Sequence, residues 1–172
     1  TRPFSRVASP DSEPKSIFVT ATDSEPLTAD VDAVLEGKQA DFERGLTLVS
    51  KLSQGKTYLC KSSGAKVQPG SASSVVQIEE FTGKHPCGSV GYHIHSLDPV
   101  HRSKSVWHLG YQAVVGIGRL FDTGKLNVER VVALSGPAVA NPRLLRTREG
   151  AATDTLVKGQ LKPGEVRVLS GS

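Results

Sequence analysis

The sequence predicts an α/β fold. Short runs rich in β-branched and aromatic residues alternate with segments of helical periodicity, and the clearest helical segment lies between two such runs. The connecting segments are rich in Gly, Pro and Ser, as loops are. A length of 172 residues suits one ordinary domain, or one small domain with part of a second. Since 37% of the residues are hydrophobic and neither a Gly-X-Y period nor a sustained heptad is present, the chain is not disordered throughout, collagenous or a coiled coil.

The first part of the chain predicts a linker, a strand and a short helix. Residues 1–15 hold three prolines with serines and mixed charges, which is typical of a linker. The β-branched run Ser16–Thr20 predicts a buried strand. After a polar loop over Thr22–Ala29, we expect a short helix over Asp30–Glu36, ended by Gly37.

The clearest helix follows. Its apolar residues Phe42, Leu46, Val49 and Leu52 are spaced by four, three and three positions, which places them on one helical face. Charged residues occupy the other faces, and Gly55 follows as a stop signal. The pattern therefore predicts an amphipathic helix that packs against a sheet.

The middle of the chain continues the alternation. We expect strands over Thr57–Cys60 and Val75–Phe81, separated by a mobile loop rich in Gly, Ser and Pro over Ser62–Ser74. Helical periodicity returns over Tyr111–Phe121, and Thr123-Gly124 closes this second helix.

Beyond about residue 129 the predicted elements become shorter and richer in strands. They are a strand over Val131–Gly136, a strand over Pro142–Thr147, a short helix over Thr153–Val157 and a closing strand over Val166–Leu169. This shift predicts a domain boundary near residue 129.

Charge is distributed unevenly along the chain. The net charge is +4, but residues 1–50 carry five Lys/Arg and nine Asp/Glu, whereas residues 51–172 carry sixteen and eight. A basic second part suits an acidic partner, which could be nucleic acid, an anionic membrane surface or an acidic protein. Because no basic heptamer and no interleaved aromatic residues occur, nucleic acid is not favoured. The longest uncharged apolar stretch, Ser105–Gly118, is too short and too polar to cross a bilayer.

The start of the sequence and the cysteines indicate a longer parent protein and a reducing compartment. There is no Met and no basic-then-apolar leader at Thr1, so we expect a piece of a longer protein. The two cysteines, Cys60 and Cys87, belong to no CxxC motif. They suggest a reducing compartment and small buried hydrophobic side chains, and their spacing leaves a disulfide open.

Two glycine-rich segments could in principle cradle a phosphate. Gly116-Ile117-Gly118 matches the opening of a GxGxxG motif, but Phe121 stands at the third glycine position and the glycines lie inside a predicted helix. We therefore expect these glycines to permit close packing. The turn Gly88–Gly91 lacks the Lys-Ser/Thr of a P-loop.

The five histidines are the strongest hint of a metal site. All lie between His85 and His108, and a strand over His93–His95 would place both imidazoles on the same side. With Cys87 they could contribute to a tetrahedral zinc site. Because the spacings match neither a zinc finger nor HExxH, we favour a mixture of surface and packed histidines.

Arginines and a tryptophan complete the candidates. The cluster Arg143, Arg146 and Arg148 is expected on a solvated edge strand, where charge discourages edge-to-edge pairing, or at a docking contact in a larger complex. Trp107 is expected as a core anchor. No catalytic, cofactor-binding or metal-binding set is complete. The candidate contact surface comprises His93, His95, Trp107, Arg143, Arg146 and Arg148.

Four sequence blocks occur in an order that carries more information than any single motif. They are Gly91–Val100, Val106–Gln112, Val131–Pro137 and Asn141–Arg148, within a dense stretch over about 83–151. Together they resemble the family of A subunits of the bacterial sodium-translocating NADH:quinone oxidoreductase.

The resemblance implies a function. The complex oxidises NADH, reduces ubiquinone and exports sodium, and its A subunit is peripheral, on the cytoplasmic side of the inner membrane. The implied partners are the other subunits of the complex, with ubiquinone as a further candidate and the membrane reached only through the complex. NADH, flavins and iron–sulfur centres are then handled by other subunits, with no cofactor in this chain, which leaves it a structural role and a candidate association with quinone. The alternative is an independent NAD(P)- or flavin-binding oxidoreductase domain.

The resemblance also implies a fold. The middle region of the family is similar to the flavoprotein subunit of respiratory complex I. Residues 16–128 are then expected to form a Rossmann-like α/β domain, and residues 129–172 the start of a β-grasp domain of the soluble-ligand-binding type. Residues 1–15 would connect to an N-terminal domain.

Overall fold

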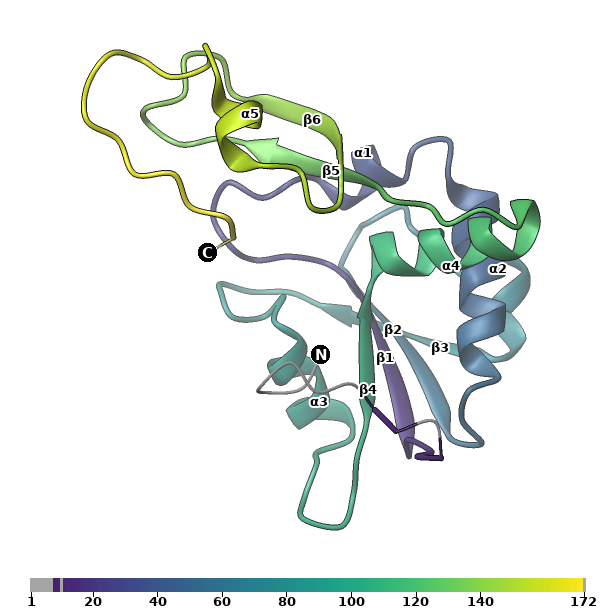
Figure 1. The fold of residues 1–172 in the computed structure, drawn as a ribbon. Helices are drawn as coiled ribbons and strands as arrows, with labels where there is room; N and C mark the ends of the chain where they lie inside the picture. Colours follow the sequence, from purple (N-terminus) through teal and green to yellow (C-terminus); the bar gives the residue numbers. More distant parts are fainter. Residues whose placement is uncertain (1–7, 10, 172) are drawn as a thin grey trace.

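The computed structural model describes residues 8–9 and 11–171, and its core is a four-stranded parallel sheet (Figure 1). The strand order is β3-β2-β1-β4, and all adjacent pairs are parallel. The strands are β1 (Ser16–Ala21), β2 (Lys56–Ser62), β3 (Val76–Phe81) and β4 (Trp107–Gly110). The strands predicted at Ser16–Thr20, Thr57–Cys60 and Val75–Phe81 are confirmed, whereas the sequence pattern does not predict β4.

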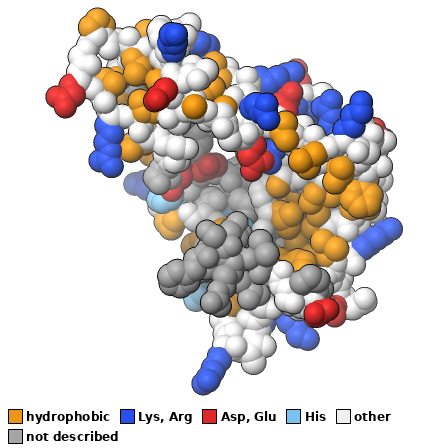
Figure 2. All heavy atoms as spheres, in the orientation of Figure 1, with side chains coloured by type: hydrophobic (Ala, Val, Ile, Leu, Met, Phe, Trp, Pro, Cys, Tyr) orange, Lys and Arg blue, Asp and Glu red, His pale blue; other side chains and the backbone are white. Residues whose placement is uncertain are grey.

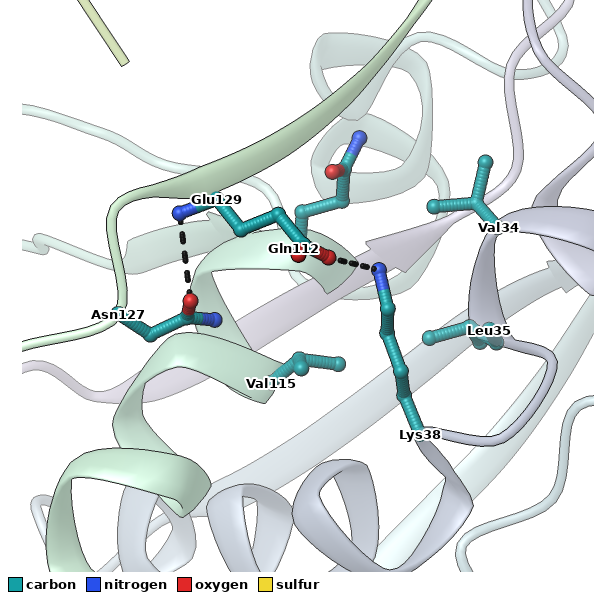
Figure 3. A pocket seen from close by; sticks show the side chains of 7 residues that line it. All are labelled: Val34, Leu35, Lys38, Gln112, Val115, Asn127 and Glu129. Carbon is teal, nitrogen blue, oxygen red and sulfur yellow. Dashed lines mark hydrogen bonds and ion pairs between the residues drawn. The ribbon is translucent and has the colours of Figure 1, made fainter. Parts of the chain in front are cut away.

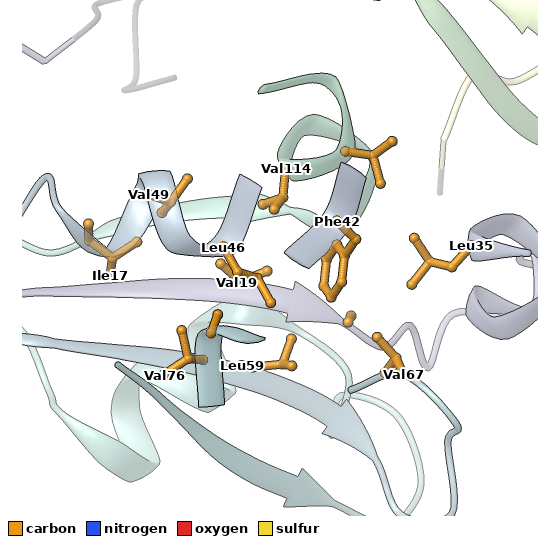
Figure 4. Packing of buried hydrophobic residues seen from close by; sticks show 13 residues of the cluster. Ile17, Val19, Leu35, Phe42, Leu46, Val49, Leu59, Val67, Val76 and Val114 are labelled. Carbon is orange, nitrogen blue, oxygen red and sulfur yellow. The ribbon is translucent and has the colours of Figure 1, made fainter. Parts of the chain in front are cut away.

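Both faces of the sheet are covered, which explains the nearly continuous apolar run of β1. Ile17 and Val19 point into the larger core, beneath helices α2 and α4, whereas Phe18 belongs to a second cluster under α3 (Figure 4). The helices are α1 (Val31–Leu35), α2 (Gln39–Ser50), α3 (Val90–Leu97) and α4 (Tyr111–Thr123). A mixed α/β fold is thereby confirmed.

Two segments differ from the predicted elements. The segment around His93, expected as a strand, is helix α3, because a stretch of three residues cannot distinguish alternation from helical periodicity. The expected loop Ser62–Ser74 contains a short 3-10 helix, η2 (Gly70–Ser74), whose Ala72 is buried in the core. The polar composition of this segment gives no sign of that burial.

Helices α2 and α4 approach each other closely through glycines. Phe42, Leu46 and Val49 of α2 are fully buried, as the spacing predicts, whereas Leu52, predicted on the same face, lies beyond the end of α2 and is 51% exposed. A Cβ at Gly118 of α4 would lie 1.8 Å from the Asp41 carbonyl oxygen. The helices therefore touch backbone to backbone, and the expectation that the Gly116-Ile117-Gly118 segment lies in a helix and permits close packing is confirmed at its last glycine.

A small antiparallel unit follows the sheet domain. It consists of β5 (Glu129–Leu134), β6 (Arg143–Arg148) and the short helix α5 (Thr153–Val157), and it lies above the carboxyl ends of the parallel strands in Figure 1. The closing strand predicted over Val166–Leu169 is wrong, because no strand among the described residues pairs with this segment.

Other expectations concern the ends of the chain and the membrane. Residues 1–7 and 10 of the predicted linker lie outside the described residues. The end of that linker packs onto the sheet domain, since Pro14 is fully buried and its carbonyl oxygen accepts a 2.6 Å hydrogen bond from Ser53. In the part of the chain that the structure describes, no helix is long and apolar enough to cross a membrane.

Replacing Gly118 by Ala should destabilise the protein. The added Cβ would force α2 and α4 apart, and overpacking of this kind costs about 1–3 kcal/mol. The matched control is Gly116→Ala in the same helix, where the nearest atom to an added Cβ is the Asn127 carbonyl oxygen at 3.8 Å. That substitution should be neutral or stabilising by up to about 1 kcal/mol. Urea unfolding of both variants checks this, and equal effects would contradict the glycine contact.

Candidate functional site

The candidate site is a cleft at the carboxyl ends of β1 and β2. Beyond β3 the chain passes through α3 and returns on the other side of β1 as β4, so the strand order reverses at β1. Open α/β sheets bind ligands beside such a reversal. The cleft has a volume of about 440 Å³, and its walls include the loop after β1 and the turn Ser62–Ala65 after β2.

The cleft is acidic. Asp23, Asp30 and Asp32 line it, and no Lys or Arg is among its lining residues. Asp30 accepts a 3.0 Å hydrogen bond from the Ala33 N–H and thereby caps α1. Asp32 accepts hydrogen bonds of 2.9–3.1 Å from the Lys66 N–H. Carboxylates therefore bind main-chain N–H groups that could otherwise bind an anion.

A buried lysine supports the turn that forms one wall. Lys61, near the end of β2, is only 4% exposed, and its Nζ donates a 2.9 Å hydrogen bond to the Ala65 carbonyl oxygen. The same Nζ lies 3.3 Å from a carboxylate oxygen of Glu80 on β3. The charge of Lys61 is thus balanced by its own neighbours and holds the turn in place.

The loop between β3 and α3 is fastened to the loop after β1. A Cβ at Gly88 would lie 2.4 Å from the Ser24 nitrogen, and the Gly88 N–H donates a 2.9 Å hydrogen bond to the Ser24 hydroxyl. His85 lies 3.1 Å from the same hydroxyl and 3.4 Å from a carboxylate oxygen of Glu25. Gly88 therefore serves a close approach between two loops.

His93 and His95 lie in different surroundings. On α3 they are two positions apart and so point to different sides; His93 is fully buried and His95 is exposed. The Nε2–H of His93 donates a 2.8 Å hydrogen bond to the Cys87 carbonyl oxygen, which leaves Nδ1 as an unpaired acceptor. Burial lowers the pKa of His93. His93 is thus a neutral, packed histidine that anchors the loop before α3.

The other candidates do not converge with His93. Trp107 is half-buried on β4 against the larger core, close to the expected role of an anchor. The arginines are exposed on β6, which pairs only with β5 among the described strands. Arg143 donates a 2.7 Å hydrogen bond to Gln160, and Arg146 lies 3.8 Å from Glu129. Among the described residues, no group of three or more His, Cys, Asp or Glu side chains could hold a metal ion.

The cysteine expectation is confirmed for one residue only. Cys60 is fully buried between the sheet and α3, and burial, with a contribution from Glu79, raises the pKa of its thiol to about 12. Cys87 is half-exposed, and its thiol donates to the Gly83 carbonyl oxygen. Both are free, so no disulfide joins them.

Sequence reasoning missed Gln112, which joins the two units and which Figure 3 shows near Lys38 and Glu129. Its side-chain Nε2 donates to the Val131 carbonyl oxygen and its Oε1 accepts from the Val131 N–H, both at 2.9 Å. Beside this contact Lys38 forms a 3.0 Å ion pair with Glu129, and the hydrogen bond from Lys38 is the main cause that lowers the pKa of Glu129. A polar residue in the first turn of an apolar helix is the signal that could have revealed it.

Lowering the pH should reduce the free energy of unfolding, because His93 is buried. Burial holds its pKa below the usual 6.5, so the unfolded chain takes up the proton first. The stabilisation is present above about pH 6.5 and is lost as the pH falls through 6.5 toward the folded-state pKa. We expect the unfolding free energy to fall between about pH 7.5 and 5.5 more steeply in the wild type than in His93→Gln. Parallel pH profiles would contradict this account.

Replacing Gln112 by Ala should loosen β5 without unfolding the sheet domain. Two hydrogen bonds to Val131 are lost, each worth about 1 kcal/mol. Hydrogen exchange of the Val131 amide should accelerate, while amides of β1 keep their protection. Gln77→Ala, at an exposed position of β3, is the control. Equal hydrogen exchange of the Val131 amide in both variants would show that Gln112 does not hold the units together.

The fold and the cleft define a mixed α/β protein with a parallel sheet and a small antiparallel unit. The chain belongs to the NqrA family: residues 1–126 match the family model described as the NqrA second alpha/beta domain, and residues 131–172 match the NQRA C-terminal domain. This confirms the family indicated by the four sequence blocks.

Its relatives are named as the A subunit of Na(+)-translocating NADH-quinone reductase. The chain is 52% identical over all 172 residues to those of Hahella chejuensis, Cellvibrio japonicus and Pseudomonas aeruginosa, and it spans 38% of their length. It is also similar to a chain in the crystal structure of an NAD+-reducing NiFe-hydrogenase in the air-oxidized state, with a TM-score of 0.63 and 18% identity. That match covers 89% of this chain and 34% of the other, and it concerns the fold alone.

Proposed function

We propose that this chain is part of a peripheral subunit of a membrane complex that transfers electrons from NADH to ubiquinone and exports sodium. The proposal is supported by relatives that are 52% identical over the whole chain and are named as the A subunit of Na(+)-translocating NADH-quinone reductase. The subunit lies on the cytoplasmic side of the bacterial inner membrane and reaches it through the other subunits. The complex, rather than this chain, catalyses the reaction.

The proposal assigns the two units to two domains. Residues 16–128 form a Rossmann-like domain related to the flavoprotein subunit of respiratory complex I, and residues 129–172 begin a β-grasp domain. The strand order and the reversal at β1 support the first assignment. The antiparallel pair β5–β6 with α5 supports the second. Residues 1–15 connect to a preceding domain.

Within the complex the chain has a structural role, and the acidic cleft is the observation that carries this conclusion. A flavin or dinucleotide brings phosphate groups, which bind free N–H groups, helix N-termini and cations. Here Asp23, Asp30 and Asp32 line the cleft on the β2 side of β1, next to the reversal between β1 and β4, so a phosphate in this cleft would meet like charge. The residues present do not fit a nucleotide, and we derive no electron-transfer step in this chain.

The N-terminal end of α4 is also unsuited to bind a phosphate. In a dinucleotide-binding fold a glycine-rich turn separates a strand from the helix that faces the pyrophosphate. Here β4 ends at Gly110 and α4 begins at Tyr111, so no turn remains between them. The first turn of the helix holds β5 through Gln112. The Gln112 side chain in this turn therefore holds two units of the protein together.

Ubiquinone belongs to the proposal as a partner of the assembled complex. Ligand sites for apolar molecules are mostly lined by hydrophobic and aromatic side chains. The cleft of this chain is lined largely by carboxylates, hydroxyls and small residues, which suits a quinone poorly. We therefore place quinone reduction in other parts of the complex.

Titration of the full-length subunit with NADH and with FMN tests the structural role. We expect no saturation up to about 1 mM, which corresponds to binding weaker than about −4 kcal/mol. Calorimetry and flavin fluorescence are the measurements, and the intact complex, which should bind and oxidise NADH, is the positive control. Tight saturable binding to the isolated subunit would instead favour an independent NAD(P)- or flavin-binding oxidoreductase domain.

A further inference from the structure

An apolar patch lies where α2, β4 and α4 meet. Figure 2 shows hydrophobic side chains gathered over this part of the surface, which Figure 1 places beside the last strand of the sheet. Phe121 is 68% exposed and Leu52 is 51% exposed. The patch consists of Leu48 of α2, Leu52 just after α2, Trp107 and Leu109 of β4, and Ile117 and Phe121 of α4.

Helical and strand periodicity place these side chains on the same side. Leu48 follows Gly45 by three positions, and Gly45 faces Val114 of α4, so Leu48 lies on the side of α2 that meets α4; Leu52 follows two residues after α2 ends at Ser50. Trp107 and Leu109 alternate with His108 and pack against the core beneath these helices. Trp107, Leu109 and Ile117 pack against the larger core, and Leu52 and Phe121 extend this apolar surface outward, with more than half of each side chain exposed in the part of the chain that the structure describes. Exposed contiguous apolar surface of this kind marks interaction sites.

The two edges of the parallel sheet are protected differently. At one edge, β3 carries the polar side chains Gln77, Glu79 and Glu80, which discourage pairing with another chain. At the other edge, β4 carries Trp107 and Leu109 and pairs only with β1 among the described residues. The β3 edge also exposes Ile78, but β4 carries no Asp, Glu, Lys or Arg, so the β4 edge suits an added apolar segment better.

Two exposed lysines flank the patch, and one carboxylate, that of Glu13, lies near them, where it accepts a 3.0 Å hydrogen bond from the Gln54 N–H. Lys51 directly precedes Leu52, and Lys15 lies beside the start of β4, since its N–H donates a 2.9 Å hydrogen bond to the Ser105 carbonyl oxygen. Both lysines are exposed, and no carboxylate among the described residues forms an ion pair with them. The helix carboxylates Asp41 and Asp122 already pair with Arg44. A partner would therefore meet two unpaired cations.

We propose that this patch docks a segment of another subunit of the complex, with apolar side chains on one face and Asp or Glu beside them. The apolar side chains cover Leu52 and Phe121 and extend the core of the sheet domain. The acidic side chains pair with Lys15 and Lys51. This inference rests on the proposed function, because it needs the assembled complex.

Crosslinking in the purified complex tests the inference. A photoreactive phenylalanine analogue replaces Leu52 or Phe121, and mass spectrometry identifies the crosslinked peptide. We expect a peptide of another subunit with Asp or Glu within a few residues of the crosslink. The same analogue at Val100, which is 53% exposed in the loop before β4, is the matched control and should give far less product. A crosslink within the same chain, to lipid or at the control level would overturn the proposal.

Charged substitutions supply a second measurement. Leu52→Asp and Phe121→Asp should leave the melting temperature of the subunit unchanged, since both side chains are exposed, but weaken its association with the complex about 30-fold or more. Val100→Asp should have no such effect. Lys51→Glu should slow association at low salt, whereas Lys84→Glu should not. Unchanged association of Leu52→Asp and Phe121→Asp would overturn the docking surface alone, whereas a wild-type subunit that never joins a complex would overturn the proposed function.

Discussion

The position of α4 determines how the rest of the molecule is arranged. Its first residue follows β4 without a loop, so the end of the strand fixes where the helix begins. Gly118 then allows contact with the backbone of α2, and Gln112 holds β5 at the other end of the helix. A larger side chain at position 118 would move both ends together. Helix packing and placement of the antiparallel unit therefore both depend on α4.

The loops around the cleft are held by hydrogen bonds of their own. In a nucleotide-binding relative of this topology, main-chain N–H groups at the carboxyl ends of the strands are kept free for phosphate. Here Asp32 accepts from the Lys66 and Val67 N–H groups, and the Ser24 hydroxyl accepts from the Gly88 N–H. The same polar groups that would bind a ligand fasten loops to one another. These hydrogen bonds stabilise the layer of loops at this end of the sheet.

Sequence periodicity predicts the elements that bury a regular apolar face, and it fails where burial depends on distant residues. Phe42, Leu46 and Val49 show the spacing of α2 directly, and the β-branched run of β1 is equally clear. The four-residue strand β4 is too short to show a pattern, and it becomes a strand because β1 offers a partner. The cleft could not be predicted, because its carboxylates and the turn after β2 come from loops about thirty residues apart in sequence.

The antiparallel unit also contacts the sheet domain at the loop after β1. Leu27 has a φ of 65°, a left-handed conformation that is unfavourable for a bulky side chain. Such strain costs about 1–3 kcal/mol and persists only where surrounding contacts fix it. The Leu27 carbonyl oxygen accepts a 3.0 Å hydrogen bond from Ser135, the residue after β5. Because Gln112 positions β5, the contact that opposes the strain at Leu27 depends in turn on the first turn of α4.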